Sequence, residues 1–209
     1  MQAMNPEQVA SLRDMLTRFV LVSDSADAAR HAEHVLNFLR QDENPWPWSR
    51  ATLAGHLTAS AWVLDSTCTH AALIHHRKLT RWLQPGGHVE NADASWCAAA
   101  QREVTEETGI TQFIEQPDAG ELFDVDVHPI PARKDEPAHV HYDLRFLFVA
   151  DVDATQLRAL HGSPDEVRDC RWFALAALAN DATIERSLRR MIALSLRRVA
   201  AADSIRCIK

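Results

Sequence analysis

The spacing of hydrophobic residues changes near residue 50 of this 209-residue chain, and that change limits the folds that the chain can adopt. Residues 1 to about 45 carry apolar residues at intervals of three and four, in "NPEQVASLRDMLTRFV" and "SADAARHAEHVLNFLRQ", which predicts two amphipathic helices. The stretch "DENPWPWSR" then interrupts the pattern with two prolines. From about residue 52 the period is two, as in strands. We therefore predict a helical N-terminal extension over residues 1–48 and one domain over residues 49–209.

Several segments of the predicted domain carry strand patterns, namely "GHLTASAWVLD", "HAALIHH", "ELFDVDVH", "HVHYDLRFLFVADV" and "CRWF". An alanine-rich helix is predicted between them, over roughly residues 94–108, where Asp93 or Ser95 can cap its start and Gly109 can end it. The amphipathic segment "IERSLRRMIALSLRRVAAA" predicts a closing helix. Strands around one central helix indicate a mixed sheet covered by helices, which is the α/β class.

Composition places the chain among globular proteins, with 46% hydrophobic and 24% charged residues. No apolar run approaches the roughly 20 residues of a membrane helix, and the first residues show no secretory signal, so we expect a cytoplasmic protein with no membrane partner. A net charge of −7 disfavours binding to a nucleic-acid polymer, which needs a basic surface, but permits a small anionic ligand. The scattered cysteines are expected to be free thiols: Cys68, Cys97, Cys170 and Cys207.

The alanine-rich helix carries three glutamates, Glu103, Glu106 and Glu107, within an arc of about 100° beside its apolar face. One interpretation is a solvated acidic face, since like charges on an exposed helix cost only about a few tenths of a kcal/mol. At a partly buried edge, however, two carboxylates about 5.5 Å apart repel by roughly 3 kcal/mol at an effective dielectric of 20. Arg102 can offset one charge, and a hard divalent cation such as Mg²⁺ or Mn²⁺ can offset the rest. The spacing alone leaves both interpretations open.

The context of these glutamates resembles the signature of the Nudix hydrolases, which runs Gly, five residues, Glu, seven residues, then Arg-Glu-apolar-x-Glu-Glu-x-Gly-apolar. Its second half is complete here in "REVTEETGI". Its first half departs from the pattern: counted from Gly87, the acidic position holds Asp93, and eight residues separate Asp93 from Arg102. The extra residue most simply lies at the junction of loop and helix. The resemblance covers roughly residues 52–180 and leaves the N-terminal segment outside.

This resemblance implies a Nudix-type α/β/α sandwich and a metal-dependent enzyme. The enzyme would hydrolyse a pyrophosphate bond in a nucleoside diphosphate linked to another moiety, with water attacking phosphorus. The resemblance also implies that Mg²⁺, with Mn²⁺ as a substitute, is held by Glu103, Glu106 and Glu107. Glu103 is the first choice for the general base and Glu166 the second, although Glu166 could equally be a further ligand or a loop carboxylate. Arg102 would orient a glutamate through a charge-assisted hydrogen bond.

Further residues near the signature are candidates for binding the substrate. Gly86 and Gly87 would let the backbone approach the metal and the phosphates, unless they form an ordinary turn. Arg77 and Lys78 in "HHRK" could meet the phosphates, or could belong to a solvated turn. Three histidines lie among the polar residues of the predicted strands and could line the substrate pocket, or could be surface or core residues: His56, His139 and His141. Core packing is expected for the tryptophans Trp62, Trp82, Trp96 and Trp172.

Two other functions are compatible with this fold. A regulatory module that binds a nucleotide without cleaving it usually lacks one or more motif glutamates, whereas this chain retains all three. An isoprenoid diphosphate isomerase needs a positioned cysteine, and no cysteine here sits beside a histidine in an obvious catalytic stretch. We expect a small nucleotide-type substrate, chosen by residues 110–140, and a homodimer is an open alternative to a monomer.

Overall fold

The computed structural model of the chain describes residues 5–41, 46–52, 54–133, 137–153, 160–163 and 165–206. Its contacts divide the chain into two units that each combine several stretches of sequence. The first unit comprises Met1–Ala61, Gly86–Glu103 and Gly120–Phe146, and the second comprises Trp62–Pro85, Val104–Ala119 and Leu147–Lys209. Among the described residues, every helix is too short or too polar to traverse a lipid bilayer.

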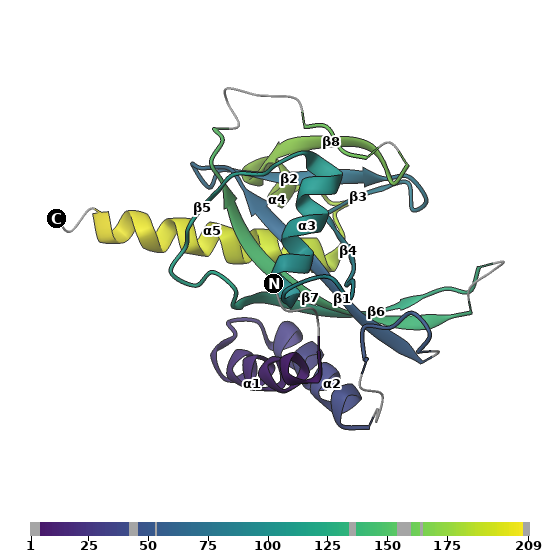
Figure 1. Ribbon diagram of the computed structural model, residues 1–209. Helices are drawn as coiled ribbons and strands as arrows, with labels where there is room; N and C mark the ends of the chain where they lie inside the picture. Colours follow the sequence, from purple (N-terminus) through teal and green to yellow (C-terminus); the bar gives the residue numbers. More distant parts are fainter. Residues whose placement is uncertain are drawn as a thin grey trace. The chain divides into compact units, whose positions relative to one another are not determined.

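The first unit contains both predicted N-terminal helices, α1 (Pro6–Val22) and α2 (Ala26–Gln41) (Figure 1). Asn5 caps α1 by accepting hydrogen bonds from amides of the first turn, and the Gln8 side chain accepts one from the Asn5 amide in return. Ser25 caps α2, since its Oγ accepts the Ala28 amide at 3.3 Å. Local capping therefore fixes where both helices begin.

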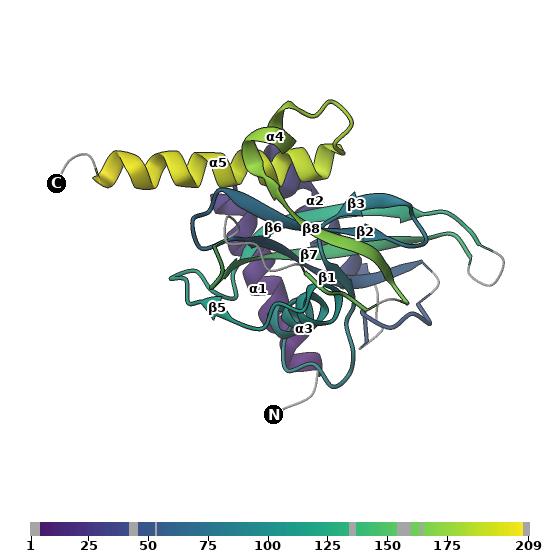
Figure 2. The same cartoon turned by 90° about the horizontal axis from the view of Figure 1, so that it is seen from above.

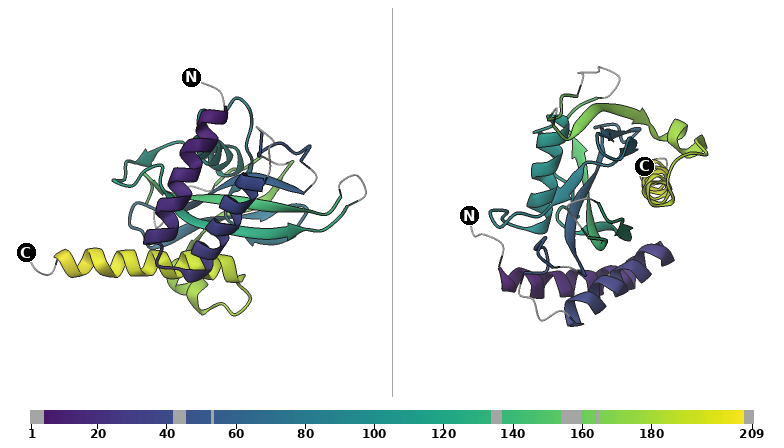
Figure 3. Two further views of the ribbon diagram at one scale, coloured as in Figure 1. Left: turned by 90° about the horizontal axis from the view of Figure 1, so that it is seen from below. Right: turned by 90° about the vertical axis from the view of Figure 1, so that its right-hand side faces the viewer.

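The two helices pack on a strand pair of the same unit, β6 (Leu122–Ile130) and β7 (His139–Ala150) (Figure 3). Leu12 and Leu16 of α1 are fully buried. Phe38 of α2 stacks on Tyr142 of β7, with ring centroids 4.2 Å apart. The helical extension thus contributes part of the hydrophobic core of the first unit.

The strands described here form an eight-stranded sheet, with β3, β2, β1, β7 and β5 in hydrogen-bonded order, while β4 pairs with β1, β6 with β7 and β8 with β2. This confirms the predicted α/β class. The strand pattern near residue 170 extends beyond "CRWF", because β8 pairs with β2 along its length and runs on into α4 (Figure 2). The remaining strands and helices are β1 (Gly55–Leu64), β2 (His70–His76), β3 (Arg81–Leu83), β4 (Gly86–His88), β5 (Phe113–Ile114), β8 (Val167–Ala174), α4 (Leu175–Asn180) and α5 (Arg186–Arg206).

The predicted central helix is α3 (Trp96–Thr108), whose boundaries follow from its caps. Ser95 is the residue that caps it, because its Oγ accepts the Ala98 amide at 3.1 Å. Gly109 ends the helix with a φ of +74°, a conformation that favours glycine. Both ends of α3 are therefore set by residues that the sequence identifies.

The charged residues of β6 and β7 are buried, namely Asp124, Asp126, Asp143 and Arg145. Arg145, 2% exposed, donates hydrogen bonds to Asp143 at 2.8 Å and to Asp124 at 3.1 Å. Burial lowers the pKa of the Arg145 guanidinium, but the surrounding aspartates more than offset this, so the pKa lies above its ordinary value. The hydroxyls of Thr58 and Ser60 on β1 also donate to Asp143. One face of these strands is thus a buried polar layer whose charges are paired.

Candidate functional site

The acidic arc of α3 is divided between buried and exposed positions. Glu103 and Glu107, one helical turn apart, are 7% and 3% exposed, and their carboxylates approach with oxygens within 4.8 Å. Glu106 lies between them in sequence and is exposed. Two neighbouring buried carboxylates repel each other, so this pair needs positive charge nearby.

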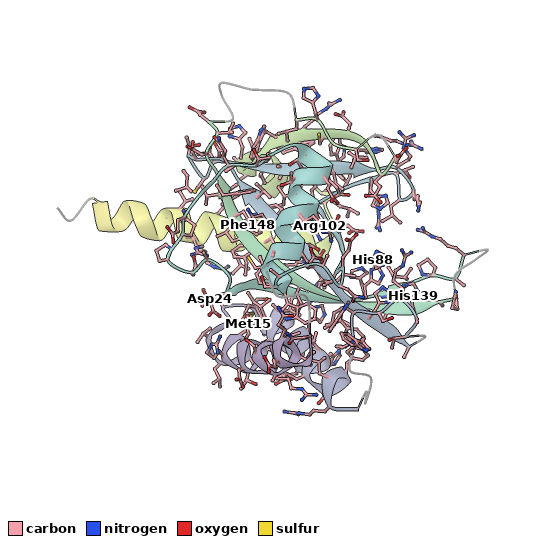
Figure 4. All side chains as sticks on the ribbon, in the orientation of Figure 1. Met15, Asp24, His88, Arg102, His139 and Phe148 are labelled. Atoms are coloured by element: carbon pink, nitrogen blue, oxygen red, sulfur yellow. The ribbon has the colours of Figure 1, made fainter. Side chains whose placement is uncertain are left out.

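Arg102, which Figure 4 labels, supplies part of that charge and holds Glu103 in place. Its Nη1 donates to Glu103 Oε1 at 3.0 Å, and its Nη2 donates to the His88 carbonyl at 2.9 Å. Its Nε and Nη2 also donate to the two carboxylate oxygens of Asp93, at 3.0 and 3.2 Å. Burial lowers the pKa of the guanidinium, but Asp93 and Glu103 outweigh this effect and raise the pKa above its ordinary value. Arg102 therefore stays charged and fixes the position of Glu103.

Asp93, at the position where the chain departs from the signature, lies in the loop before α3 and is 7% exposed. Its Oδ2 accepts the Glu90 amide at 2.8 Å in addition to the hydrogen bond from Arg102. Ser95, the other residue predicted as a possible cap of α3, is the one that caps it, so Asp93 is not the cap. It joins the loop to the arginine that holds Glu103.

The glycine pair lies in strand β4, so the interpretation as an ordinary turn is wrong. A Cβ on Gly87 would lie 2.7 Å from Glu103 Oε1. A Cβ on Gly86 would lie 2.5 Å from the Ser60 Cα, and the φ of Gly86 is +153°. The Gly86 position is therefore limited to glycine, whereas a side chain at Gly87 would displace the carboxylate of Glu103, which the backbone approaches directly.

Glu166 reaches the acidic helix through a loop that is hydrogen-bonded to the helix end. The amides of His161 and Ser163 donate to the carbonyls of Thr108 and Glu106, at 3.1 and 2.9 Å. A Cβ on Gly162 would lie 2.0 Å from the Glu107 carbonyl oxygen, so only glycine permits this approach. The loop satisfies carbonyls that the helix leaves open. It also brings an oxygen of Glu166 within 4.8 Å of the Glu107 carboxylate.

Arg77 and Lys78 lie exposed in the turn between β2 and β3. The Arg77 amide donates to the Glu166 carbonyl at 2.9 Å, so the turn is attached to the loop that carries Glu166. The Lys78 amide donates to His76 Nδ1 at 3.1 Å. The basic turn and the Glu166 loop are thus neighbours in the second unit.

The histidines considered from the sequence belong to a larger group in the first unit. His56, His139 and His141 have ring centroids 4.8 to 5.0 Å apart. His88 and His128 join them, with centroids 5.4 and 5.6 Å from His141, and were not identified from the sequence. Burial lowers the pKa of His141 to about 2, and the other four histidines add to that effect. We refer to these five residues as the histidine cluster; Figure 4 labels its members His88 and His139.

The cysteines that the structure describes are free thiols, as predicted, while Cys207 lies outside the described residues. Burial raises the pKa of all three described thiols, that of Cys97 to about 11.

A cavity of about 320 Å³ lies elsewhere in the second unit, against Trp82, Phe173 and Leu188, and its lining includes none of the acidic residues above. Of the tryptophans expected in the core, Trp62 and Trp96 are buried, and Trp82 and Trp172 are partly buried.

Comparisons with known proteins identify a family. A family model described as NUDIX domain matches residues 55–194. Among solved structures, the chain is similar to a NUDIX-family hydrolase from Clostridium perfringens, with 20% identity, coverage of 70% of this chain and 97% of that chain, and a TM-score of 0.48. The chain is also similar to a C. elegans Ap4A hydrolase in a binary complex, with 17% identity, coverage of 69% of this chain and 98% of that chain, and a TM-score of 0.45. A third similar structure is the NUDIX domain of Shewanella oneidensis NrtR complexed with ADP ribose. It has 17% identity, coverage of 78% of this chain and 97% of that chain, and a TM-score of 0.47. A search of curated proteins finds no match to the chain.

Proposed function

Because the chain belongs to the NUDIX domain family, we propose that it hydrolyses a pyrophosphate bond in a nucleoside diphosphate linked to another moiety, with the help of a divalent cation. The family match spans well over half of the chain and confirms the resemblance seen in the sequence. The activity that we propose on this basis is that of a Nudix pyrophosphohydrolase. The proposal of cation-assisted hydrolysis rests on the buried pair Glu103 and Glu107. Arg102 donates a hydrogen bond to Glu103, and an oxygen of Glu166 lies near the carboxylate of Glu107.

The donor atoms fit a hard cation. Carboxylate oxygens are the ligands that Mg²⁺ and Mn²⁺ prefer, and the buried glutamates need a positive charge that Arg102 supplies only in part. We assign Glu103, Glu106 and Glu107 as ligands, and we add Glu166 because its oxygen lies near that of Glu107. Glu106 is included because it follows Glu103 by three residues and shares its side of the helix. A bound cation would neutralise the pyrophosphate oxygens and acidify the attacking water.

The general base is proposed to be Glu103, with Glu166 as the alternative. Arg102 holds the Glu103 carboxylate in one orientation, which is what a base needs in order to meet a water molecule at a fixed position. Glu166 is exposed and joins the site through a loop, so its orientation depends on that loop. Comparing the pH dependence of kcat in Glu103→Gln and Glu166→Gln separates the two, because loss of the base removes the ascending limb.

The phosphates are proposed to meet the backbone of β4 and the basic turn. At Gly86 and Gly87 the strand has no side chain that would separate it from Glu103. Arg77 and Lys78 would add positive charge, since their turn is hydrogen-bonded to the Glu166 loop. Charge neutralisation of a pyrophosphate by these side chains is compatible with the net negative charge of the whole chain, because it needs only a local cluster.

The alternatives are less well supported by the chain. A binding module without catalysis gives no reason for the buried glutamates and the arginine that orients one of them. An isoprenoid diphosphate isomerase needs a reactive cysteine, and burial raises the pKa of each described cysteine: Cys68, Cys97 and Cys170.

The domain boundaries, the cellular location and the oligomeric state of the protein are proposed as well. We propose a domain over residues 49–209 preceded by a helical extension over residues 1–48, a cytoplasmic enzyme, and a homodimer as the alternative to a monomer. The elution volume on a calibrated column decides the assembly.

Release of phosphorylated products from a panel of nucleoside diphosphate derivatives, with and without Mg²⁺, tests the proposed activity. We expect cleavage of at least one linked nucleoside diphosphate that stops when a chelator removes the cation. Tight nucleotide binding without turnover would favour the binding module, and conversion of an isoprenoid diphosphate would favour the isomerase.

A further inference from the structure

The histidine cluster is built by the register of four strands in the first unit. His139 and His141 are two residues apart on β7 and therefore point to the same face. His128 on β6 stands directly opposite His141, so it shares that face. On the paired strands β1 and β4, His88 stands opposite Thr58, two residues from His56. The five imidazoles thus come from four strands and converge because of strand pairing.

The nitrogens of three of these rings are close enough to share one ion. One ring nitrogen each from His56, His139 and His141 lies within 4.8 Å of the other two. The Nε2 atoms of His139 and His141 are 3.1 Å apart. Two nitrogens bound to one tetrahedral zinc ion would be about 3.3 Å apart, since the zinc–nitrogen distance is about 2.0–2.1 Å. For this pair of nitrogens, the existing spacing therefore needs little adjustment to accept an ion.

The outer nitrogens of two rings are held by acceptors, as is usual for histidines that bind metals. His139 Nδ1 donates to the Pro137 carbonyl at 2.9 Å, which leaves the lone pair on Nε2, the atom that faces His141. His128 Nδ1 lies 3.1 Å from Asp126 Oδ2, which has the same consequence for its Nε2. The protein thus directs the Nε2 lone pair of His139 toward His141.

A hydrogen bond between His139 and His141 would explain their short separation without a metal. It would not explain why a third ring nitrogen approaches both, or why His88 and His128 adjoin the same group. Imidazole nitrogen selects borderline transition metals, whereas carboxylate oxygen selects Mg²⁺. The cluster therefore differs in donor chemistry from the glutamates of α3.

We propose that His56, His139 and His141 form a binding site for a transition-metal ion of the zinc type, distinct from the Mg²⁺ site proposed on α3. His56 and His139 are buried, at 1% and 8% exposure, so the ion would sit within the first unit. Three histidines leave one tetrahedral position, which His88, His128 or water would fill. The site goes beyond the proposed hydrolysis, because binding needs neither substrate nor the motif glutamates.

Zinc binding to the full-length protein tests the proposal. After removal of metals with a chelator, titration calorimetry and elemental analysis should show one Zn²⁺ per chain. The double variant Glu103→Gln/Glu107→Gln should bind it with unchanged affinity, whereas His139→Gln/His141→Gln should bind at least about 100-fold more weakly, as expected when ligands of the ion are lost. His34→Gln, which alters an exposed histidine of α2, is the matched control and should behave like the parent protein.

A measurement on the unsubstituted protein covers the case in which the histidine variant does not fold. X-ray absorption at the zinc edge, with one equivalent of Zn²⁺, should show a nearest shell dominated by imidazole nitrogens. A shell of oxygens alone would overturn the proposal, as would the absence of stoichiometric zinc uptake. Zinc binding that disappears in the glutamate variant but persists in the folded histidine variant would overturn it too. Because no substrate is involved, these results do not depend on the proposed hydrolysis.

Discussion

Arg102 donates two hydrogen bonds to the carboxylate of Asp93, from Nε to Oδ1 at 3.0 Å and from Nη2 to Oδ2 at 3.2 Å. The same guanidinium donates to Glu103, so one arginine joins the loop before α3 to a glutamate of the candidate metal site. Two-point contact between a planar guanidinium and a carboxylate fixes orientation as well as distance. The aspartate at the position where the chain departs from the family signature therefore helps to position Glu103.

Asp93→Asn should weaken this arrangement while keeping the size of the side chain. Loss of a buried charge-assisted contact is expected to lower the free energy of unfolding by about 1–3 kcal/mol, and kcat should fall because Glu103 loses its fixed orientation. Chemical denaturation and initial rates measure the two effects. Asp118→Asn, at a partly exposed aspartate that pairs with Arg198, is the control and should change stability by less than about 0.5 kcal/mol. Equal behaviour of the two variants would contradict the positioning role.

Glu107→Gln should abolish most of the activity, because it keeps the shape of the side chain and removes a charged ligand. We expect a loss in kcat of at least about 100-fold, with an unchanged circular dichroism spectrum. Glu115→Gln, at an exposed glutamate outside the acidic helix, should retain the parent rate. Assignment of Glu107 as a ligand would be wrong if the purified variant turned over substrate as fast as the parent.

Deletion of residues 1–48 should lower the melting temperature or change the oligomeric state, because α1 and α2 supply core to the first unit. Point variants give a finer measure: Leu16→Ala removes a fully buried side chain and should cost about 2–5 kcal/mol. Leu21→Ala alters a side chain that is 80% exposed and should cost almost nothing. An unchanged melting temperature and elution volume after the deletion would show that the extension is a passive tail.

Cys97 should react slowly with alkylating reagents at neutral pH. Burial raises the pKa of this thiol to about 11, so the thiolate that reacts is scarce below that pH and its share grows as the pH rises toward 11. At pH 8 we expect alkylation at least about 100-fold slower than that of a small-molecule thiol with a pKa of about 8.5. Peptide mapping by mass spectrometry after timed labelling measures the rate. Rapid labelling of Cys97 would reopen the isomerase alternative.

Features that depend on nearby residues in the chain could be predicted from the sequence. The boundaries of α3 follow from Ser95 and Gly109, and the approach of Glu103 to Glu107 follows from the pitch of a helix. The family signature supplied the remaining chemistry. Which metal ligands and which base act in this chain stays a prediction, since the geometry alone does not test them.

Features that depend on strand pairing could not be predicted. The pair Gly86 and Gly87 is compatible with a turn in the sequence, but β4 forms because both residues pair with β1, a partner that local spacing does not identify. The positions of His88 and His128 could not be predicted for the same reason, because their place beside His141 depends on the register of four strands. A shift of one residue in that register would send each side chain to the opposite face.

The fate of an oxygen atom from water tests the proposed hydrolysis most directly. The parent enzyme would be incubated in ¹⁸O-labelled water with Mg²⁺ and a nucleoside diphosphate linked to a second group, and both products analysed by mass spectrometry. We expect one label on a phosphate of one product, no reaction after chelation of the cation, and negligible release of inorganic phosphate from simple monoesters. Label on a carbon-bound hydroxyl, or an equal rate without any divalent cation, would contradict cation-assisted attack of water on phosphorus.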